Sequence, residues 1–361
     1  MSLPQAKAHI LDITPYAQGK SKGESTKQRI IKLSSNENPL GPSQKAIAAF
    51  RTMSDLHRYP DGAAHAIREA IAEVFSLDIN RLVMGAGSDE LINFLIHAYA
   101  GKGDEVLYSE HSFLMYKIYT IAHGATPVTA PETNLTTNVD ALLDAVTENT
   151  KIVFVANPNN PTGTLVAQSE IDRLRAELPE HVLLVLDAAY AEYVEDADYD
   201  AGAKLVESTN NTVMLRTFSK IYGLPALRIG WAYAPEAVVS VLNRVRSPFN
   251  VNSAAMVAAI AAVKDTAYTR YAVEYNAKER QRLNEALTAM ELEVTPSAGN
   301  FILVHFPATG KTAQAANTHL LNANIIAREV GAYKLPNSLR FTIGTQEENT
   351  LLIEAMQEFM A

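Results

Sequence analysis

Lys220 is the residue of this sequence best placed for covalent chemistry. It follows a β-branched, apolar run at 212–218, which predicts a buried strand. Desolvation and the nearby cations Arg216 and Arg228 would favour the neutral amine, the form that attacks carbonyl carbons. Because Ser219 and Arg228 together offer phosphate ligands, the segment suggests a Schiff base between Lys220 and a phosphorylated aldehyde. The alternative is a strand that surfaces at an ordinary solvated lysine.

A second polar group follows the predicted strand at 152–156. The run V-F-V-A-N-P-N-N-P-T-G-T at 153–164 is rich in turn-forming residues. In the functional interpretation, Pro161 fixes Asn160 so that its amide donates a hydrogen bond into a site. Turn formation alone is the alternative explanation.

Asp187 ends a third apolar strand, within L-V-L-D-A-A-Y. An unpaired carboxylate is costly at such a position, so a cation should meet it, and a protonated pyridine nitrogen is one candidate. A helix N-cap or an ion pair with Arg216 would also explain it. Tyr190 lies near Asp187 if a turn follows the strand.

The segment L-V-M-G-A-G-S-D-E-L-I at 82–92 predicts a strand, a glycine turn and a helix start. Backbone N–H groups of Gly87, Ser88 and Asp89 would then face an anion at the positive end of the helix dipole. The dinucleotide fingerprint is incomplete, because Glu90 stands where its third glycine should be, so one phosphate fits better than a pyrophosphate. Ordinary helix capping is the alternative.

These four segments supply a lysine for imine formation, an aspartate for a pyridinium, polar groups for a phenolate oxygen, and phosphate ligands. Those are the requirements of pyridoxal 5′-phosphate. The carboxyl ends of parallel strands share one edge of a sheet, where open α/β sheets bind ligands. The sequence therefore predicts this cofactor and assigns no metal.

The elements that must position these residues are typical of an α/β fold. Short apolar strands alternate with helical patterns from about 45 to 235. We expect strands at 106–109, 152–156, 182–187, 212–218, 228–233, 301–306 and 339–343. We expect helices at 89–100, 112–122, 169–176 and 253–290, and a last helix opened by the capping box Thr345–Glu348. The predicted domains are an N-terminal arm at 1–44 that belongs to the small domain, a large cofactor-binding domain at 45–250 with a mostly parallel sheet flanked by helices, and a smaller α/β domain at 251–361.

Bulk composition narrows the class of protein. The chain has 361 residues, 47% of them hydrophobic and 20% charged, an ordinary globular balance. A net charge of −9 argues against a general nucleic-acid binder. There is no cysteine, which excludes disulfides and thiolate chemistry. No signal peptide or membrane span is visible, so we expect a cytoplasmic protein without membrane partners.

The sequence resembles the fold-type-I pyridoxal-phosphate aminotransferases, and within them the histidinol-phosphate aminotransferase family. The likeness runs over nearly the whole chain. Its markers are S-S-N-E-N-P-L-G-P (34–42), H-R-Y-P-D-G (57–62), G-S-D-E-L (87–91), N-P-N-N-P-T-G (157–163), D-A-A-Y (187–190), S-K (219–220), L-R-I-G (227–230), S-A-G-N-F (297–301) and L-R-F-T-I-G-T (339–345).

The resemblance implies a role for each site residue. Lys220 would hold the cofactor covalently and Asp187 would pair with its ring nitrogen. Contacts to the ring oxygen would come from Asn160 and Tyr190, and Phe113 would stack on the ring. The phosphate would lie among Gly87, Ser88, Asp89, Ser219, Arg228 and, from a second subunit of a homodimer with shared active sites, Tyr59. The anionic end of the substrate would be held by Arg328 and Arg340, helped by Tyr16 and Asn300. Surface salt bridges are the alternative for the two arginines.

The implied reaction is transamination between L-histidinol phosphate and 2-oxoglutarate. Aromatic amino acid transamination uses the same machinery and is the closest rival, because the specificity pocket cannot be read from these residues. Threonine-phosphate decarboxylation shares the fold and a phosphate-bearing substrate. A cofactor-binding transcription regulator would need a basic DNA-binding domain, and the arm of about 40 residues is too short and too weakly basic.

Overall fold

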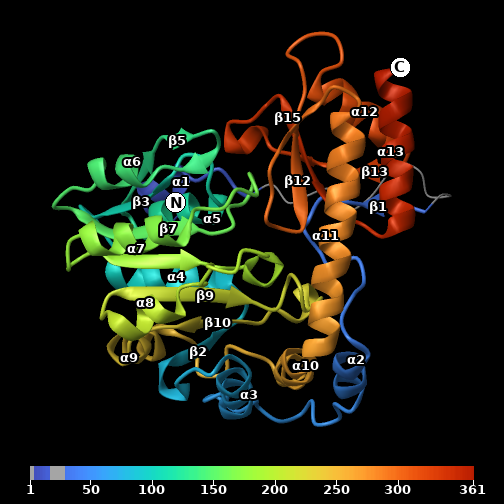
Figure 1. The fold of residues 1–361 in the computed structure, drawn as a ribbon. Helices are drawn as coiled ribbons and strands as arrows, with labels where there is room; N and C mark the ends of the chain where they lie inside the picture. Colours follow the sequence, from blue (N-terminus) through green and yellow to red (C-terminus); the bar gives the residue numbers. More distant parts are fainter. Residues whose placement is uncertain (1–3, 17–28) are drawn as a thin grey trace.

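The computed structural model describes residues 4–16 and 29–361. A seven-stranded sheet occupies one part of the molecule and a four-stranded sheet the other (Figure 1). Six strands of the large sheet run in the same direction, and β10 runs antiparallel to both neighbours. Their order is β2 (Leu82–Gly85), β10 (Gly230–Tyr233), β9 (Thr212–Thr217), β8 (Leu183–Asp187), β7 (Thr150–Ala156), β3 (Glu105–Ser109) and β4 (Thr126–Ala130).

The central strands are buried on both faces, which explains why they read as continuous apolar runs. Along β8, Leu183 and Val185 belong to a cluster with α4 (Ser88–Tyr99) and α9 (Glu236–Val245). Leu184 and Leu186 point to the other face, where they join α6 (Val139–Asp144) and α7 (Gln168–Glu177). α5 (Leu114–Ala122) packs beside α4.

The second sheet is antiparallel and is formed by strands from the C-terminal part of the chain. Its order is β11 (Glu293–Thr295), β12 (Phe301–His305), β15 (Ser338–Thr342) and β14 (Arg328–Glu329). The long helix α11 (Thr266–Thr288) links its region to the large sheet (Figure 1). α12 (Ala313–Asn322) and α13 (Gln346–Met360) complete its core, and β1 (Ile31–Lys32) pairs in parallel with β13 (Ile325–Ile326).

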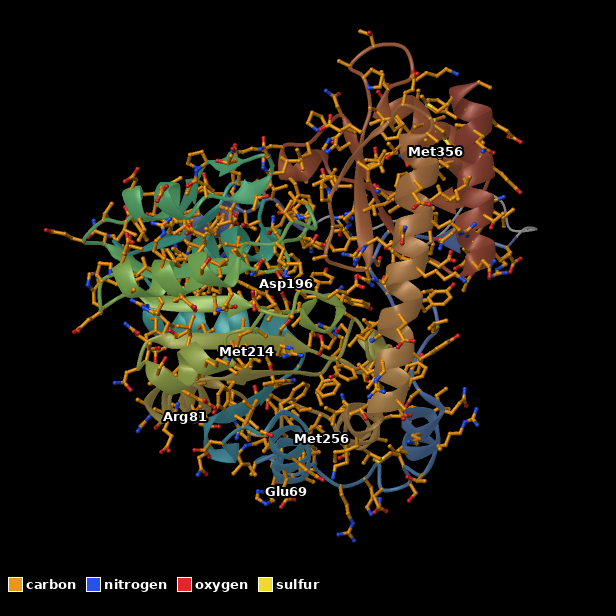
Figure 2. The ribbon with its side chains drawn as sticks, viewed as in Figure 1. Glu69, Arg81, Asp196, Met214, Met256 and Met356 are labelled. Carbon is orange, nitrogen blue, oxygen red and sulfur yellow. The ribbon has the colours of Figure 1, made fainter. Side chains whose placement is uncertain are left out.

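The two parts of the molecule have different hydrophobic clusters. Met214 of β9 and Met256 of α10 (Ser253–Lys264) belong to one cluster, and Met356 of α13 belongs to another (Figure 2). The remaining elements are α1 (Ala8–Leu11), α2 (Gln44–Arg51), α3 (His65–Phe75), β5 (Glu132–Thr133), β6 (Thr136–Thr137) and α8 (Ala203–Ser208), with short 3₁₀ turns at Ile79–Arg81, Ala191–Tyr193, Pro225–Leu227 and Gly331–Tyr333.

Most predicted elements are present, with three corrections. The single helix expected at 253–290 is wrong: α10 ends at Lys264, α11 begins at Thr266, and Asp265 between them has φ −88° and ψ 62°. The strand expected from Arg228 begins at Gly230, because Arg228 is left-handed with φ 52°. The helix expected from residue 112 begins at Leu114. The capping box of the last helix is confirmed.

The division into domains stays a prediction. α10 packs against α2 and α3, in the cluster that also covers the large sheet. Residues 1–3 and 17–28 of the predicted arm lie outside the described residues. Within the described ranges, no helix is long and apolar enough to cross a membrane, and no cluster of three or more acidic or histidine side chains offers a metal site.

Candidate active site

A cavity of about 200 Å³ opens at the carboxyl ends of β7, β8 and β9. The last residue of each strand contributes to its wall: Ala156, Asp187 and Thr217. Its other lining residues are Ser88, Asp89, Phe113, Pro158, Asn160, Ala189, Tyr190, Ser219, Lys220, Pro225 and Arg228. The structure thus brings together the four segments that the sequence analysis singled out.

Asp187 is buried at the base of this cavity, with 6% of its surface exposed. Its Oδ2 accepts a hydrogen bond from the Tyr116 hydroxyl at 2.7 Å, and its Oδ1 has no partner among the described residues. Burial raises the pKa of the Asp187 carboxyl, partly offset by Tyr116 and by the charge of Lys220. The alternative ion pair with Arg216 is wrong, because Arg216 binds Glu192 at 2.6 Å.

Lys220 lies beside Asp187 in the same cavity, with its Nζ 5.4 Å from the ring centre of Tyr190. Burial lowers the pKa of the Lys220 amine to about 8, and the cations Arg340 and Arg228 add to the effect. The amine is therefore neutral at a lower pH than an exposed lysine. The contribution expected from Arg216 is wrong: that guanidinium is neutralised by Glu192 and lies 5.0 Å from the Phe75 ring centre.

An anion cradle lies at the N-terminus of α4. Gly87 caps the helix with φ 88°, and a Cβ there would come within 2.6 Å of Nη2 of Arg228. Arg228 donates through Nη1 to Ser219 Oγ at 3.3 Å. A cation, a hydroxyl and the positive end of a helix dipole therefore converge beside Ser88.

The carboxylate of Asp89 turns toward the protein instead of forming part of this cradle. It accepts a hydrogen bond from the Tyr119 hydroxyl at 2.8 Å, and burial raises the pKa of the Asp89 carboxyl. Any role of Asp89 in holding an anion would thus come from its backbone. The alternative of ordinary side-chain capping is wrong, because the N-cap Gly87 has no side-chain hydrogen bond, although Glu90 Oε2 accepts from the preceding Ala86 amide at 2.7 Å.

Asn160 and Tyr190 are held by residues from the second sheet and the N-terminal segment. Arg340 donates through Nη1 to Asn160 Oδ1, which leaves the amide nitrogen as the group that Asn160 offers to the cavity. Asn36 donates through Nδ2 to the Tyr190 hydroxyl at 2.9 Å. Burial raises the pKa of Tyr190 to about 12, so its hydroxyl stays protonated at neutral pH.

Two buried arginines lie opposite each other on neighbouring strands. Arg328 of β14 pairs with Arg340 of β15 in the sheet register, and they are 7% and 5% exposed. The Arg328 guanidinium lies 5.6 Å from the ring centre of Tyr16. Fully buried Asn300 donates to the Asn36 carbonyl at 3.0 Å. Surface salt bridges therefore do not explain the arginines, since both side chains are buried.

Tyr59 is separate from this group. Its side chain is 82% exposed and stacks on Phe249, with ring centres 4.5 Å apart, and it does not line the cavity of its own chain. Phe113 does line the cavity. The roles that the resemblance implies for both aromatic residues stay predictions.

The sequence analysis missed Tyr116 and Asn36, which hydrogen-bond to Asp187 and Tyr190. Tyr116 comes three residues after Phe113 in a helical pattern, so the two share a helix face, and this spacing was the available signal. Asn36 lay within the 34–42 motif, but nothing local showed which distant side chain it meets.

The described residues fit pyridoxal phosphate. Asp187 Oδ1 is a buried acceptor without a partner among the described residues, the α4 cradle suits a phosphate, and Lys220 is a half-buried amine with a lowered pKa. One cavity contains all three. The arrangement supplies a nucleophilic amine that also serves as a general base, with an anion site beside it.

Comparisons with known proteins agree with this geometry. The model of the family "Aminotransferase class I and II" matches residues 28–356. Two relatives named histidinol-phosphate aminotransferase, from Rhodopseudomonas palustris HaA2 and Paramagnetospirillum magneticum, are 52% and 54% identical to the chain over 363 and 362 residues. These alignments span the whole of this chain and 100% and 99% of the relatives.

Solved structures show the same fold. The histidinol-phosphate aminotransferase of Sinorhizobium meliloti, solved in complex with pyridoxal-5′-phosphate, superposes with a TM-score of 0.91 at 27% identity, over 99% of this chain and 98% of that one. A Thermus thermophilus aspartate aminotransferase superposes with a TM-score of 0.85 at 20% identity, over 99% and 100% of the two chains. The second likeness shows the fold alone.

Proposed function

The chain belongs to the class I and II aminotransferases, and we propose that it transfers the amino group of L-histidinol phosphate to 2-oxoglutarate. The products are imidazole-acetol phosphate and L-glutamate, a reaction of histidine biosynthesis, and the cofactor is pyridoxal 5′-phosphate. The observation that carries this proposal is the full-length identity of 52% and 54% to two proteins named for that activity.

The cofactor, when bound, supplies the electron sink that transamination needs. Asp187 would accept a hydrogen bond from the protonated ring nitrogen of the cofactor and keep it protonated, because its Oδ1 is buried without a partner among the described residues. The Lys220 amine takes the proton from the α-carbon of the substrate as general base, and its lowered pKa keeps part of it neutral near pH 7. Asn160 and Tyr190, which line the same cavity, would contact the ring oxygen of the cofactor.

The two buried arginines suit an amine donor that bears a phosphate. A phosphate monoester carries between one and two negative charges at neutral pH, which two guanidinium groups match. Burial lowers the pKa of Arg340, and neighbouring Arg328 adds to the effect. An anion between the two side chains would relieve their repulsion. The same pair would receive a carboxylate of 2-oxoglutarate in the second half of the reaction.

A homodimer belongs to the proposal. Tyr59 and Phe249 form an exposed aromatic stack outside the cavity of their own chain. In the arrangement implied by the family resemblance, this Tyr59 contacts the cofactor phosphate of a second copy. A cytoplasmic location stays a prediction of the sequence.

A substrate panel tests the function. The holoenzyme would be given 2-oxoglutarate with L-histidinol phosphate, L-phenylalanine or threonine phosphate, and glutamate would be measured. We expect kcat/KM for histidinol phosphate to exceed that for phenylalanine by about tenfold or more, the value of one additional charged hydrogen bond. Faster turnover of phenylalanine would favour the aromatic aminotransferase. Release of carbon dioxide from threonine phosphate without 2-oxoglutarate would favour the decarboxylase.

A further inference from the structure

Tyr116 is a buried residue of α5 that lies between two parts of the proposed cofactor site. It is 0% exposed and stacks on Phe154, with ring centres 4.5 Å apart and planes 11° apart. The ring of Phe113 meets it edge-on, at 5.8 Å and 89°. Because both neighbours restrict the ring of Tyr116, its hydroxyl has a fixed position.

That hydroxyl has one acceptor, the carboxylate of Asp187. The Tyr116 Oη donates to Asp187 Oδ2 at 2.7 Å. The other carboxylate oxygen, Oδ1, has no partner among the described residues. Hydrogen bonds to ionised acceptors are short and roughly twice as strong as neutral ones. The bond therefore fixes which oxygen is occupied and which one is available.

We propose that Tyr116 is a positioning residue for the reaction: its hydroxyl holds the Asp187 carboxylate in its charged form and leaves Oδ1 available for the cofactor's ring nitrogen. This inference rests on the proposed cofactor, but not on the identity of the amine donor. Tyr116 touches neither substrate nor cofactor in this role and acts entirely through Asp187.

The physical need for such a residue follows from the burial of Asp187. Burial raises the pKa of this carboxyl, while the Tyr116 hydroxyl, the Ala189 backbone and the charge of Lys220 lower it, and Asp89 raises it. A protonated Asp187 would lose the charge that keeps a ring nitrogen protonated. The tyrosine hydroxyl offsets part of the desolvation and favours the charged carboxylate before any ligand binds.

Tyr108 provides a matched control in the same aromatic cluster. It is 4% exposed and its ring centre lies 5.8 Å from that of Tyr116. Its hydroxyl is buried and has no hydrogen-bond partner among the described residues. Replacing either tyrosine by phenylalanine removes one buried hydroxyl from the same core, but only Tyr116→Phe removes a bond to Asp187.

The first measurement is the affinity of the apoenzyme for pyridoxal phosphate. We expect Tyr116→Phe to weaken binding about tenfold, the lower end for a hydrogen bond to a charged group. In the holoenzyme kcat should fall about tenfold, while KM for the amine donor changes less than about twofold. Tyr108→Phe should leave the affinity and both kinetic constants within about twofold of the unmodified protein. Equal affinities for the two variants would overturn the proposal.

The second measurement is the thermal stability of the apoenzyme against pH. A carboxyl group whose pKa is higher in the folded than in the unfolded state binds more protons when the protein is folded. Its contribution to stability therefore falls as the pH rises from the unfolded-state pKa to the folded-state pKa. Losing the Tyr116 hydroxyl raises the pKa of Asp187 further. The deficit in Tm of Tyr116→Phe should therefore widen as the pH rises above the ordinary carboxyl range, through the raised pKa of Asp187, whereas that of Tyr108→Phe should stay constant. A constant deficit in both variants would indicate a purely structural role and contradict the proposal.

A double-mutant cycle identifies the residue through which Tyr116 acts. In an Asp187→Asn background no carboxylate remains to be held, so adding Tyr116→Phe should change the cofactor affinity less than about twofold. A further tenfold loss in that background would mean that the hydroxyl acts elsewhere and would overturn the proposal. Neither the affinity nor the stability assay uses a substrate, so both results stand if the substrate panel favours another amine.

Discussion

Two groups of residues in the site are built in different ways. The strand-end group consists of Asn160, Asp187 and Lys220, each at or just after the end of a strand in the large sheet. The arginine group consists of Tyr16, Asn300, Arg328 and Arg340, which come from the N-terminal segment and the region of the second sheet. Backbone topology places the first group, whereas side-chain contacts between distant segments assemble the second.

The contacts of Arg340 show what this difference means. Its guanidinium donates to Asn160 of the large-sheet region and to the Ser34 carbonyl at 3.1 Å. One side chain therefore joins the second sheet, the N-terminal segment and the cofactor cavity. Changes in the strand-end group should affect the chemistry with every substrate. Changes in the arginine group should lower kcat/KM more for substrates with an anionic group at that position than for substrates without one.

The largest effect is expected for Lys220→Ala in the strand-end group. Loss of the amine removes both the nucleophile and the general base, so kcat should fall by about 10⁴-fold or more with every amine donor. The visible absorbance band of the imine between Lys220 and the cofactor should also be lost. Lys204→Ala is the matched control, because the Lys204 side chain is 86% exposed. A Lys220→Ala enzyme that keeps turnover and absorbance would refute the assignment.

The arginine group gives the sharpest test of the comparison. Arg328→Gln and Arg340→Gln should each lower kcat/KM for the anionic amine donor by about 10²-fold. Each substitution removes one of the two buried positive charges that are proposed to bind the substrate anion. Arg340→Gln should also weaken binding of pyridoxal phosphate, since Arg340 donates a hydrogen bond to Asn160 in the cofactor cavity. Titrating both apoenzymes with pyridoxal phosphate measures this. Equal cofactor affinities would mean that the two groups are independent.

How much the sequence could predict follows the same division. The strands that carry Asp187 and Lys220 were recognisable because both faces of the large sheet are apolar, and parallel strands share a carboxyl edge. The break at Asp265 was not recognisable, because both flanking segments are strongly helical in pattern. Local pattern also did not reveal that Asn36 meets Tyr190, 154 positions away in the chain.

A smaller effect is expected at the anion cradle. Gly87→Ala places a Cβ 2.6 Å from Arg228 Nη2, at a backbone φ of 88°. Displacing that guanidinium should weaken binding of pyridoxal phosphate about tenfold, the value of one charged hydrogen bond. Gly103→Ala separates this effect from backbone strain, because Gly103 has φ 94° and open space around its Cβ position. Similar losses of affinity in both variants would show that the Arg228 contact is unimportant.

The last prediction tests whether burial destabilises the charged form of the Lys220 amine before the cofactor binds. Burial lowers the pKa of Lys220 to about 8 from its ordinary 10.5, so between these values the folded apoenzyme binds fewer protons than the unfolded chain. Its stability should therefore rise with pH across this window, by at most about 3 kcal/mol. Lys220→Met removes the titrating group, and the difference in Tm between the two apoenzymes should change in favour of the lysine form from about pH 8 to about pH 10. A difference in Tm that does not change with pH would mean that burial does not destabilise the charged amine. Covalent attachment to the cofactor would then not be favoured by removing that charge.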